Sequence, residues 1–339
     1  MTIELEFPGV ELQSATNVAD HASFYLEGYE VLVNRVMAAR GKPEFLGQKP
    51  QVCRFCTKTK PEVTFRNLAH AVPELAGNGT LLTYYECDAC NERFSAFEDD
   101  LGKMTLIERA AGRVLGKRGI PSVRTSQKRS RIDASVRGFD IKQYEGDPIV
   151  SIDESAKTMT VKIAPQLFRR LGAFKALVKI ALTLMPDSEI ANVPEALRWL
   201  RAAGLKTDQI DDGTRYRCIR TFTPGPAPFA AARVFLLKRK TRDVPGPMYV
   251  FVLAFGNLSF QIIVRCPQED QHLIGTQVSL RTVPVFAFMD QAGVRGSTRH
   301  WVDDLSSDSQ VNGSSSIVFH FDRLEDVAPS VESSDTSTQ

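Results

Sequence analysis

Apolar residues recur at helical spacing in two stretches of the first hundred residues. In residues 17–40 they fall about every three to four positions and the run ends at Gly41-Lys42-Pro43, which predicts one long amphipathic helix. In residues 88–102, Phe94, Phe97 and Leu101 form a single apolar stripe, so a second helix is expected there.

Two shorter runs between these helices have the composition of β-strands. Residues 62–66 and 81–85 are rich in β-branched and aromatic residues, and the glycine-containing loop 76–80 precedes the second run. Two strands joined by a turning loop predict a hairpin.

From residue 145 onward the pattern predicts a larger unit of strands and helices. Helical periodicity covers residues 165–185, with a broad apolar face, and residues 194–203. Strand-like runs occupy residues 149–152, 159–163, 215–222, 229–237, 249–255, 258–264 and 316–321. Consecutive strands on hairpin connections predict an antiparallel sheet with helices on one side, so the fold class is α+β.

Four of the six cysteines lie in two Cys-x-x-Cys pairs. Cys53, Cys56, Cys87 and Cys90 can place four thiolates around one ion, because a two-residue gap turns both sulfurs of a pair toward the same point. We therefore expect a structural zinc site in a reducing compartment. The other two, Cys218 and Cys266, lie in apolar strand-like runs and are expected to be buried free thiols.

Further motifs follow in a fixed order within this cysteine region. His70 stands before Ala71-Val72-Pro73, and Asn91 directly follows the last cysteine at the start of the predicted helix. With the cysteine pairs, these motifs make about 50 residues resemble the four-cysteine branch of the HNH endonucleases. The resemblance implies a ββα-metal fold, in which a two-stranded hairpin packs on one helix with the nuclease site in the cleft between them.

The resemblance also implies a reaction and roles for two residues. HNH enzymes hydrolyse phosphodiester bonds with one divalent metal, which suggests Mg²⁺ or Mn²⁺ here. His70 matches the general base and Asn91 matches a metal-site residue. The alternatives are that His70 fixes its loop and that Asn91 caps its own helix.

One position departs from the family pattern. The residue before the general base usually binds the metal, but here it is Ala69. A carboxylate from Glu74 or Glu98 could replace it, and Glu98 lies about 20° from Asn91 on the predicted helix. Otherwise the metal site is lost, and the chain is a zinc-stabilised nucleic-acid-binding protein. A third possibility is that the zinc region is a scaffold and the larger unit binds a ligand or a protein partner.

The segment after this helix is strongly basic. Residues 103–142 hold eleven Lys and Arg residues against three Asp and Glu residues, a net charge of +8, while the whole chain is only +2. A basic excess beside a nuclease-like helix predicts contacts with the phosphates of nucleic acid, most plausibly double-stranded DNA, although a solvated basic linker is the alternative. The proposed nucleic-acid-binding residues are Arg113, Lys117, Arg118, Lys128, Arg129 and Arg131.

These patterns together predict how the chain is divided. We expect an N-terminal helical segment (1–48), a zinc-bound HNH-like module (49–103), a basic connecting segment (104–144), an α+β domain of unknown role (145–324) and a disordered tail (325–339). No apolar run is long enough for a membrane span and no signal peptide is recognisable, so we expect a soluble cytoplasmic protein. The first helix could pair with another copy to form a homodimer, although ordinary packing fits its periodicity better.

Overall fold

The computed structural model describes residues 10–12, 18–135, 138–202, 216–273, 278–285, 294 and 296–324. The predicted disordered tail at 325–339 lies outside these residues. None of the described helices has the length and apolar composition needed to cross a membrane.

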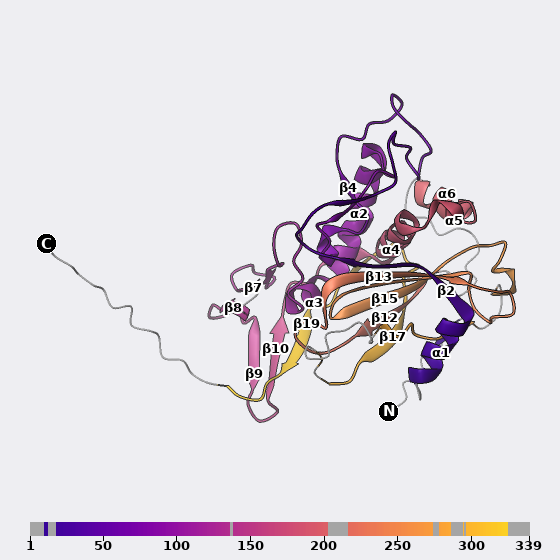
Figure 1. Ribbon diagram of the computed structural model, residues 1–339. Helices are drawn as coiled ribbons and strands as arrows, with labels where there is room; N and C mark the ends of the chain where they lie inside the picture. The colour runs from indigo at the N-terminus through magenta and orange to yellow at the C-terminus, as the bar shows by residue number, and fades with distance from the viewer. Residues whose placement is uncertain are drawn as a thin grey trace.

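A six-stranded antiparallel sheet forms the largest element of the fold (Figure 1). Its strands, in spatial order, are β17 (Arg299–Asp304), β12 (Arg217–Phe222), β15 (Leu258–Val264), β14 (Tyr249–Gly256), β13 (Phe229–Arg239) and β2 (Tyr29–Met37). The four strands predicted between residues 215 and 264 are all present, with ends shifted by up to two residues. The α+β fold class with an antiparallel sheet is confirmed.

The helices predicted at 165–185 and 194–203 pack in one buried cluster with one face of this sheet, as expected, and the N-terminal helix lies on the other face. Every residue of β14 is buried, which requires a cover on each face. The central helix α4 (Arg170–Leu184) packs on the face that carries Phe251 and Leu253. The short helix α1 (Val18–Gly28) contributes Tyr25 to a second apolar cluster on the face of Val250 and Val252.

The prediction of one long helix over residues 17–40 is correct for its first half and wrong for its second half. Helix α1 ends at Gly28, and the chain continues as the edge strand β2. This strand pairs antiparallel with β13, matching Val33 with Leu236. Three valines within nine residues favour an extended backbone, and the pairing with a distant strand decides the conformation. The helix that suggested a homodimer is therefore short, and a dimer stays a prediction.

The cysteine region forms a smaller layer against α4. Its three-stranded sheet has the order β3 (Glu44–Leu46), β5 (Leu81–Thr83), β4 (Ala69–His70), and the one-turn helix η1 (Glu74–Ala76) follows β4. Helix α2 (Asp88–Met104) confirms the predicted helix. The strand predicted at residues 62–66 is absent, because this segment forms a loop and the hairpin strand begins at Ala69.

The α2 and α4 helices share one apolar core. Phe94 and Leu101 of α2, Leu171 and Leu177 of α4, and Phe251 of the large sheet belong to a single buried cluster. Two short helices, α5 (Asp187–Ile190) and α6 (Pro194–Arg201), follow α4. The cysteine region is therefore packed firmly onto the large sheet through α4, although the domain boundaries stay a prediction.

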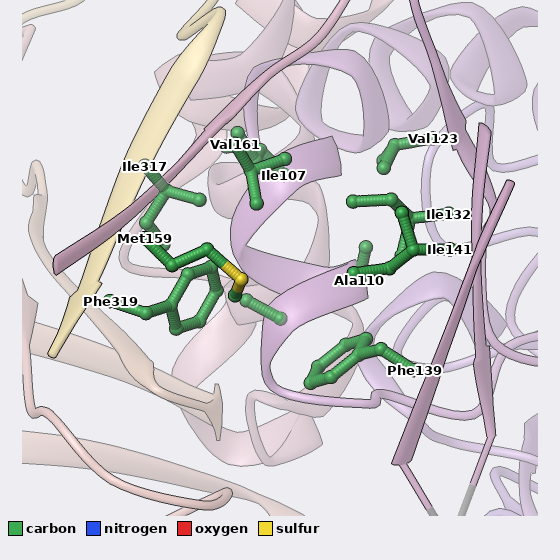
Figure 2. Close-up of a pocket in the computed structure, with 11 residues that line it drawn as sticks. Ile107, Ala110, Val123, Ile132, Phe139, Ile141, Met159, Val161, Ile317 and Phe319 are labelled. Carbon is green, nitrogen blue, oxygen red and sulfur yellow. The ribbon is translucent and has the colours of Figure 1, made fainter. Parts of the chain in front are cut away.

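The basic segment is folded, so the alternative of a solvated linker is wrong for its described part. It forms α3 (Leu106–Ala111) and a three-stranded sheet of β6 (Val123–Arg124), β7 (Arg131–Ser135) and β8 (Gly138–Lys142). A neighbouring sheet has the order β19 (Ser316–His320), β10 (Thr158–Lys162), β9 (Val150–Asp153). An apolar pocket between these elements is lined by Ile107, Phe139, Met159 and Phe319, among others (Figure 2).

Two further strand pairs and one short helix complete the described chain. Strand β11 (Leu167–Arg169) pairs antiparallel with β18 (Gln310–Asn312), directly before α4, where a continuous helix from residue 165 was expected. Strand β1 (Val10–Leu12) pairs parallel with β16 (Val278–Leu280), and the one-turn helix η2 spans Gln271–Leu273.

Candidate metal centre and active site

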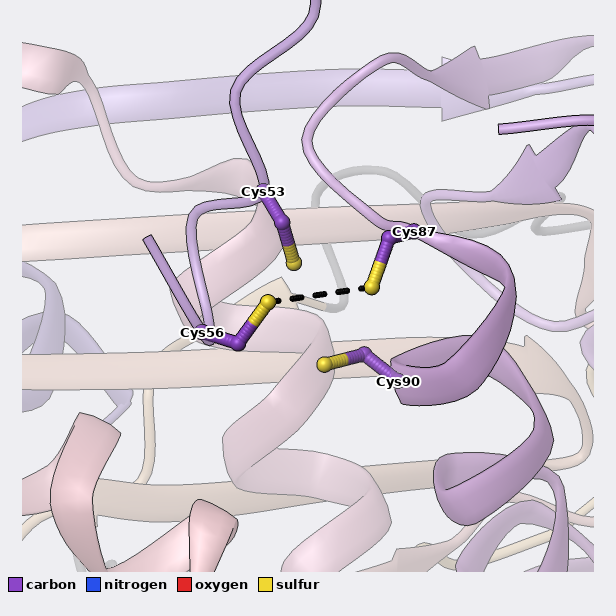
Figure 3. Close-up of side chains that lie close together, drawn as sticks. All are labelled: Cys53, Cys56, Cys87 and Cys90. Carbon is purple, nitrogen blue, oxygen red and sulfur yellow. Dashed lines mark hydrogen bonds between the residues drawn. The ribbon is translucent and has the colours of Figure 1, made fainter. Parts of the chain in front are cut away.

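The four predicted cysteines come together at one point (Figure 3). Cys53 and Cys56 lie on a tight turn, Cys87 is the residue before α2, and Cys90 lies in its first turn. Their Sγ atoms all lie within 4.8 Å of one another, and those of Cys56 and Cys87 are 3.7 Å apart. Tetrahedral zinc with Zn–S bonds of about 2.3 Å requires sulfurs about 3.8 Å apart. The four thiols therefore fit a zinc ion.

Asp88 connects this centre to the loop that leads to His70. Its carboxylate accepts hydrogen bonds from the backbone N–H groups of Arg66 (3.0 Å) and Asn67 (2.9 Å) and from the Thr64 hydroxyl. Burial opposes ionisation, but these donors outweigh it and hold the pKa of Asp88 below its usual value. The sequence reasoning did not identify Asp88, although an acidic residue in the first turn of a helix is a recognisable signal.

The loop of the hairpin is fixed by a buried asparagine. The Asn78 side-chain amide donates to the carbonyls of Val72 (2.6 Å) and Leu81 (2.9 Å), and its oxygen accepts from the N–H groups of Thr80 and Leu81. All four hydrogen-bonding positions on this side chain are thus used. Asn78 thereby sets the separation of the two strands on which His70 depends.

His70 lies at the end of β4, opposite Leu82 of β5. Its side chain is 25% exposed, and its Nδ1 is 4.0 Å from the Glu74 carboxylate. Burial lowers the pKa of His70 below its usual value, although the charges of Glu74 and Glu98 oppose this shift. The imidazole is therefore neutral at pH 7, which is the form that can accept a proton.

The two candidate carboxylates have different surroundings. Glu98 Oε1 is 2.9 Å from the ammonium of Lys179, a fully buried residue on α4. The same ammonium lies 3.1 Å from the buried Glu86 and 3.3 Å from the backbone carbonyl oxygen of His70. Glu74, in contrast, lies beside the imidazole, with only the exposed Lys117 at 3.9 Å as a cationic neighbour.

Lys179 and Glu86 were missed by the sequence reasoning. Lys179 comes 81 residues after Glu98 and 93 after Glu86 in the chain, so no local spacing connects them. The available signal was a pair of lysines, Lys175 and Lys179, within the apolar run of α4. A lysine in such a run usually has a buried acidic partner.

Asn91 lies in the first turn of α2 and is partly exposed. Its backbone N–H donates to the Cys87 carbonyl (2.9 Å), and Cys87 occupies the N-cap position without a capping hydrogen bond from its side chain. Within the described ranges its side-chain amide makes no hydrogen bond and is free to bind a ligand. Ala69 is 2% exposed and has no ligand atom.

Among the described residues, His70 is not part of a preassembled cluster of His, Cys, Asp or Glu metal ligands. Across the described part of the chain, the cysteine centre is the only group of three or more His, Cys, Asp or Glu ligand atoms within such mutual reach. His70, Glu74 and Glu98 thus do not meet at one point. Among the described candidates, Glu74 and Asn91 are the ones whose side-chain oxygens are not held by a buried ion pair and could therefore coordinate a metal ion.

The six predicted phosphate-binding residues fall into two groups. Arg113, Lys117 and Arg118 follow α3, and Lys117 approaches Glu74. Lys128 and Arg129 lie exposed in the turn between β6 and β7, where Arg129 stacks over the Tyr144 ring at 5.6 Å. Arg131 pairs with Asp133 at 2.9 Å.

Comparison with known families decides what this cysteine region is. Residues 53–106 match the family described as HNH endonuclease. This segment is similar to the HNH endonuclease family. The match includes the four cysteines, His70 and all of α2, which confirms the resemblance found in the sequence. Comparisons with curated proteins and with solved structures find no match to the chain.

Proposed function

We propose that this protein is a metal-dependent endonuclease that hydrolyses phosphodiester bonds in nucleic acid, with double-stranded DNA as the first candidate substrate. The observation that carries the proposal is a partly exposed histidine beside a carboxylate, in the segment that matches the HNH endonuclease family. His70 lies on the hairpin beside the Glu74 carboxylate, and the resemblance of its motif to the HNH endonucleases implies that it is the general base. A basic segment follows the domain directly and suits a polyanionic substrate.

In this proposal His70 is the general base, and Glu74 serves both His70 and the metal ion. His70 accepts a proton from the water molecule that attacks phosphorus, and Glu74 keeps the imidazole oriented. Glu74 and Asn91 are the residues that would hold Mg²⁺ or Mn²⁺, since Glu98 is already paired with Lys179. When bound, the metal ion would stabilise negative charge on the phosphorane and on the leaving 3′-oxygen.

Two observations favour a second candidate, a zinc-stabilised nucleic-acid-binding protein that does not cut. Ala69 removes the usual metal ligand, and Lys179 neutralises one of the two carboxylates that could replace it. In this candidate the zinc centre and the basic residues keep their roles, and His70 only fixes the hairpin.

One assay separates the two candidates. Purified protein is incubated with linear and circular DNA and with RNA, with Mg²⁺, with Mn²⁺ or with no added divalent ion. The endonuclease nicks or linearises circular DNA, or cuts RNA internally, only when the ion is present. The second candidate binds the same nucleic acids in a salt-sensitive manner and leaves them intact.

We also propose a cytoplasmic location, because zinc-binding thiols must stay reduced. A role in defence against foreign DNA is proposed by analogy with stand-alone HNH proteins of bacteria. Restriction of phage growth by cells that express the protein, and its loss in a His70→Ala strain, would test that role.

A further inference from the structure

The small sheet that carries His70 also carries two aromatic residues on the same face. Phe45 of β3 and His70 of β4 are both paired with Leu82 of the strand between them. Paired residues on neighbouring strands project to the same side of a sheet. Tyr84, two residues after Leu82, shares this face because the Tyr84 N–H continues the ladder to the Leu46 carbonyl (2.9 Å).

Phe45 and the half-buried Tyr84 form a stacked pair. Their ring centroids are 4.7 Å apart with an interplanar angle of 11°, and Phe45 remains 39% exposed. The Lys49 ammonium lies 5.1 Å from the centre of the Tyr84 ring. The next residue, Tyr85, is already engaged within the protein. The Arg54 guanidinium lies over its ring, and its hydroxyl donates a hydrogen bond to Asp187.

The surroundings of this pair are positively charged. Residues 35–49 contain four basic residues and one acid, and the acid, Glu44, is paired with Arg35 at 3.1 Å. Arg40, Lys42 and Lys49 are exposed. Flat apolar rings within a basic surface are the combination that binds single-stranded nucleic acid, where bases stack and cations contact phosphates.

The separation from His70 suits a nucleotide near the cut. Phe45 and His70 are two strand spacings apart, which is about 10 Å. This distance is about three stacked nucleotide steps of 3.4 Å, and fewer when the strand is extended.

We propose that Phe45 and Tyr84 are a stacking platform for an unpaired base of the substrate, within a few nucleotides of the phosphodiester bond at His70, and that Lys49 contacts an adjacent phosphate. Inside a duplex both faces of a base are covered by its neighbours, so only an unpaired base can use the exposed ring. The substrate class is therefore nucleic acid with an unpaired stretch beside the cut. This inference rests on the proposed nuclease function.

The test measures binding without added divalent ions, so that no cleavage occurs. The probes are a duplex with a short single-stranded gap containing 2-aminopurine and the same duplex fully paired, each made in DNA and in RNA. Stacking on an aromatic ring quenches 2-aminopurine fluorescence. The proteins are wild type, Phe45→Ala, Phe45→Leu, which keeps apolar bulk without a ring, and Phe139→Ala, an exposed phenylalanine outside the HNH domain.

Wild type should bind the gapped duplex more tightly than the paired one and quench the probe. Phe45→Ala and Phe45→Leu should weaken binding of the gapped duplex by about 5- to 150-fold and lose the quenching, because one base–aromatic stack is removed. Both variants should keep the zinc content and the paired-duplex affinity of wild type, and Phe139→Ala should behave like wild type throughout.

The unfavourable outcomes are distinct. Equal binding of the gapped duplex by wild type and Phe45→Ala overturns the platform and leaves the nuclease proposal standing. Equal weakening of both duplexes overturns the selectivity for an unpaired base. Failure of wild-type protein to bind any of the four probes overturns the nuclease proposal and the platform with it.

Discussion

The ammonium group of Lys179 lies 3.3 Å from the backbone carbonyl oxygen of His70. This contact joins the central helix of the large sheet to the strand that carries the proposed general base. The same ammonium pairs with Glu86 and Glu98, so three groups of the HNH domain converge on one buried cation. The larger part of the chain thus supports the HNH hairpin from the side of α4.

Removing this cation should destabilise the protein strongly. Lys179→Met leaves Glu86 and Glu98 without their counter-charge, and loss of one partner of a buried ion pair costs about 3–5 kcal/mol. Urea unfolding measures the change in the free energy of unfolding. Lys162→Met, at an exposed position on β10, is the matched control and should change it by less than about 0.5 kcal/mol.

The triple variant Lys179→Met, Glu86→Gln, Glu98→Gln should recover a substantial part of this loss, because no unpaired charge then remains buried. If Lys179→Met alone unfolds at the urea concentration of wild type, the ion cluster does not support the hairpin.

The cysteine centre should hold one zinc ion per chain. Cys87→Ser should lose the metal and make residues 53–102 more accessible to protease, because the ion joins the turn of Cys53 and Cys56 to the start of α2, and the packing of α2 on α4 does not replace that link. Metal analysis and limited proteolysis measure both effects. Cys218→Ser, at a buried thiol of the large sheet, should keep its zinc. Wild-type protein with less than about half an equivalent of zinc would contradict the assignment.

Glu74 and Glu98 should respond differently to the same substitution. Glu74→Gln should raise the Mg²⁺ or Mn²⁺ concentration needed for half-maximal cleavage, because it weakens a proposed metal ligand next to His70. Glu98→Gln should leave this concentration nearly unchanged and alter stability instead, since its partner is Lys179. Titration of cleavage rate against metal concentration distinguishes them, and the reverse pattern would transfer the ligand role to Glu98.

The basic turn between β6 and β7 should contribute affinity without sequence preference. Replacing Lys128, Arg129 and Arg131 with alanine should weaken DNA binding for all sequences and reduce the slope of log affinity against log salt by up to about 0.9 per lost phosphate contact. Arg131 is paired with Asp133, so most of the change should come from the other two residues. An unchanged salt slope would mean that this turn does not contact DNA.

The sequence was sufficient for features that depend on local spacing. Two Cys-x-x-Cys pairs predicted the thiol cluster, and the stripe of Phe94, Phe97 and Leu101 predicted α2, because both follow from the geometry of a few consecutive turns. The match of residues 53–106 to the HNH family agrees with both.

Features that depend on distant partners were not predictable. Residues 29–37 were expected to continue a helix, but they pair with β13, about 200 residues later in the chain. Glu98 was a plausible metal ligand from its helix face alone, whereas the structure pairs it with a lysine of α4. In both cases a residue far away in the sequence determines the backbone conformation or the ion pairing, and local periodicity cannot predict such a partner.

The central claim is that His70 is the general base for phosphodiester hydrolysis, and one measurement tests it most directly. Cleavage of a circular DNA or RNA substrate with Mg²⁺ or Mn²⁺ is compared for wild type and His70→Ala, with zinc content and nucleic-acid binding measured on the same preparations. Wild type should cut, and His70→Ala should lose cleavage while keeping its zinc and its affinity, because the imidazole holds neither the zinc nor the substrate. Cleavage by His70→Ala at the wild-type rate would contradict the account.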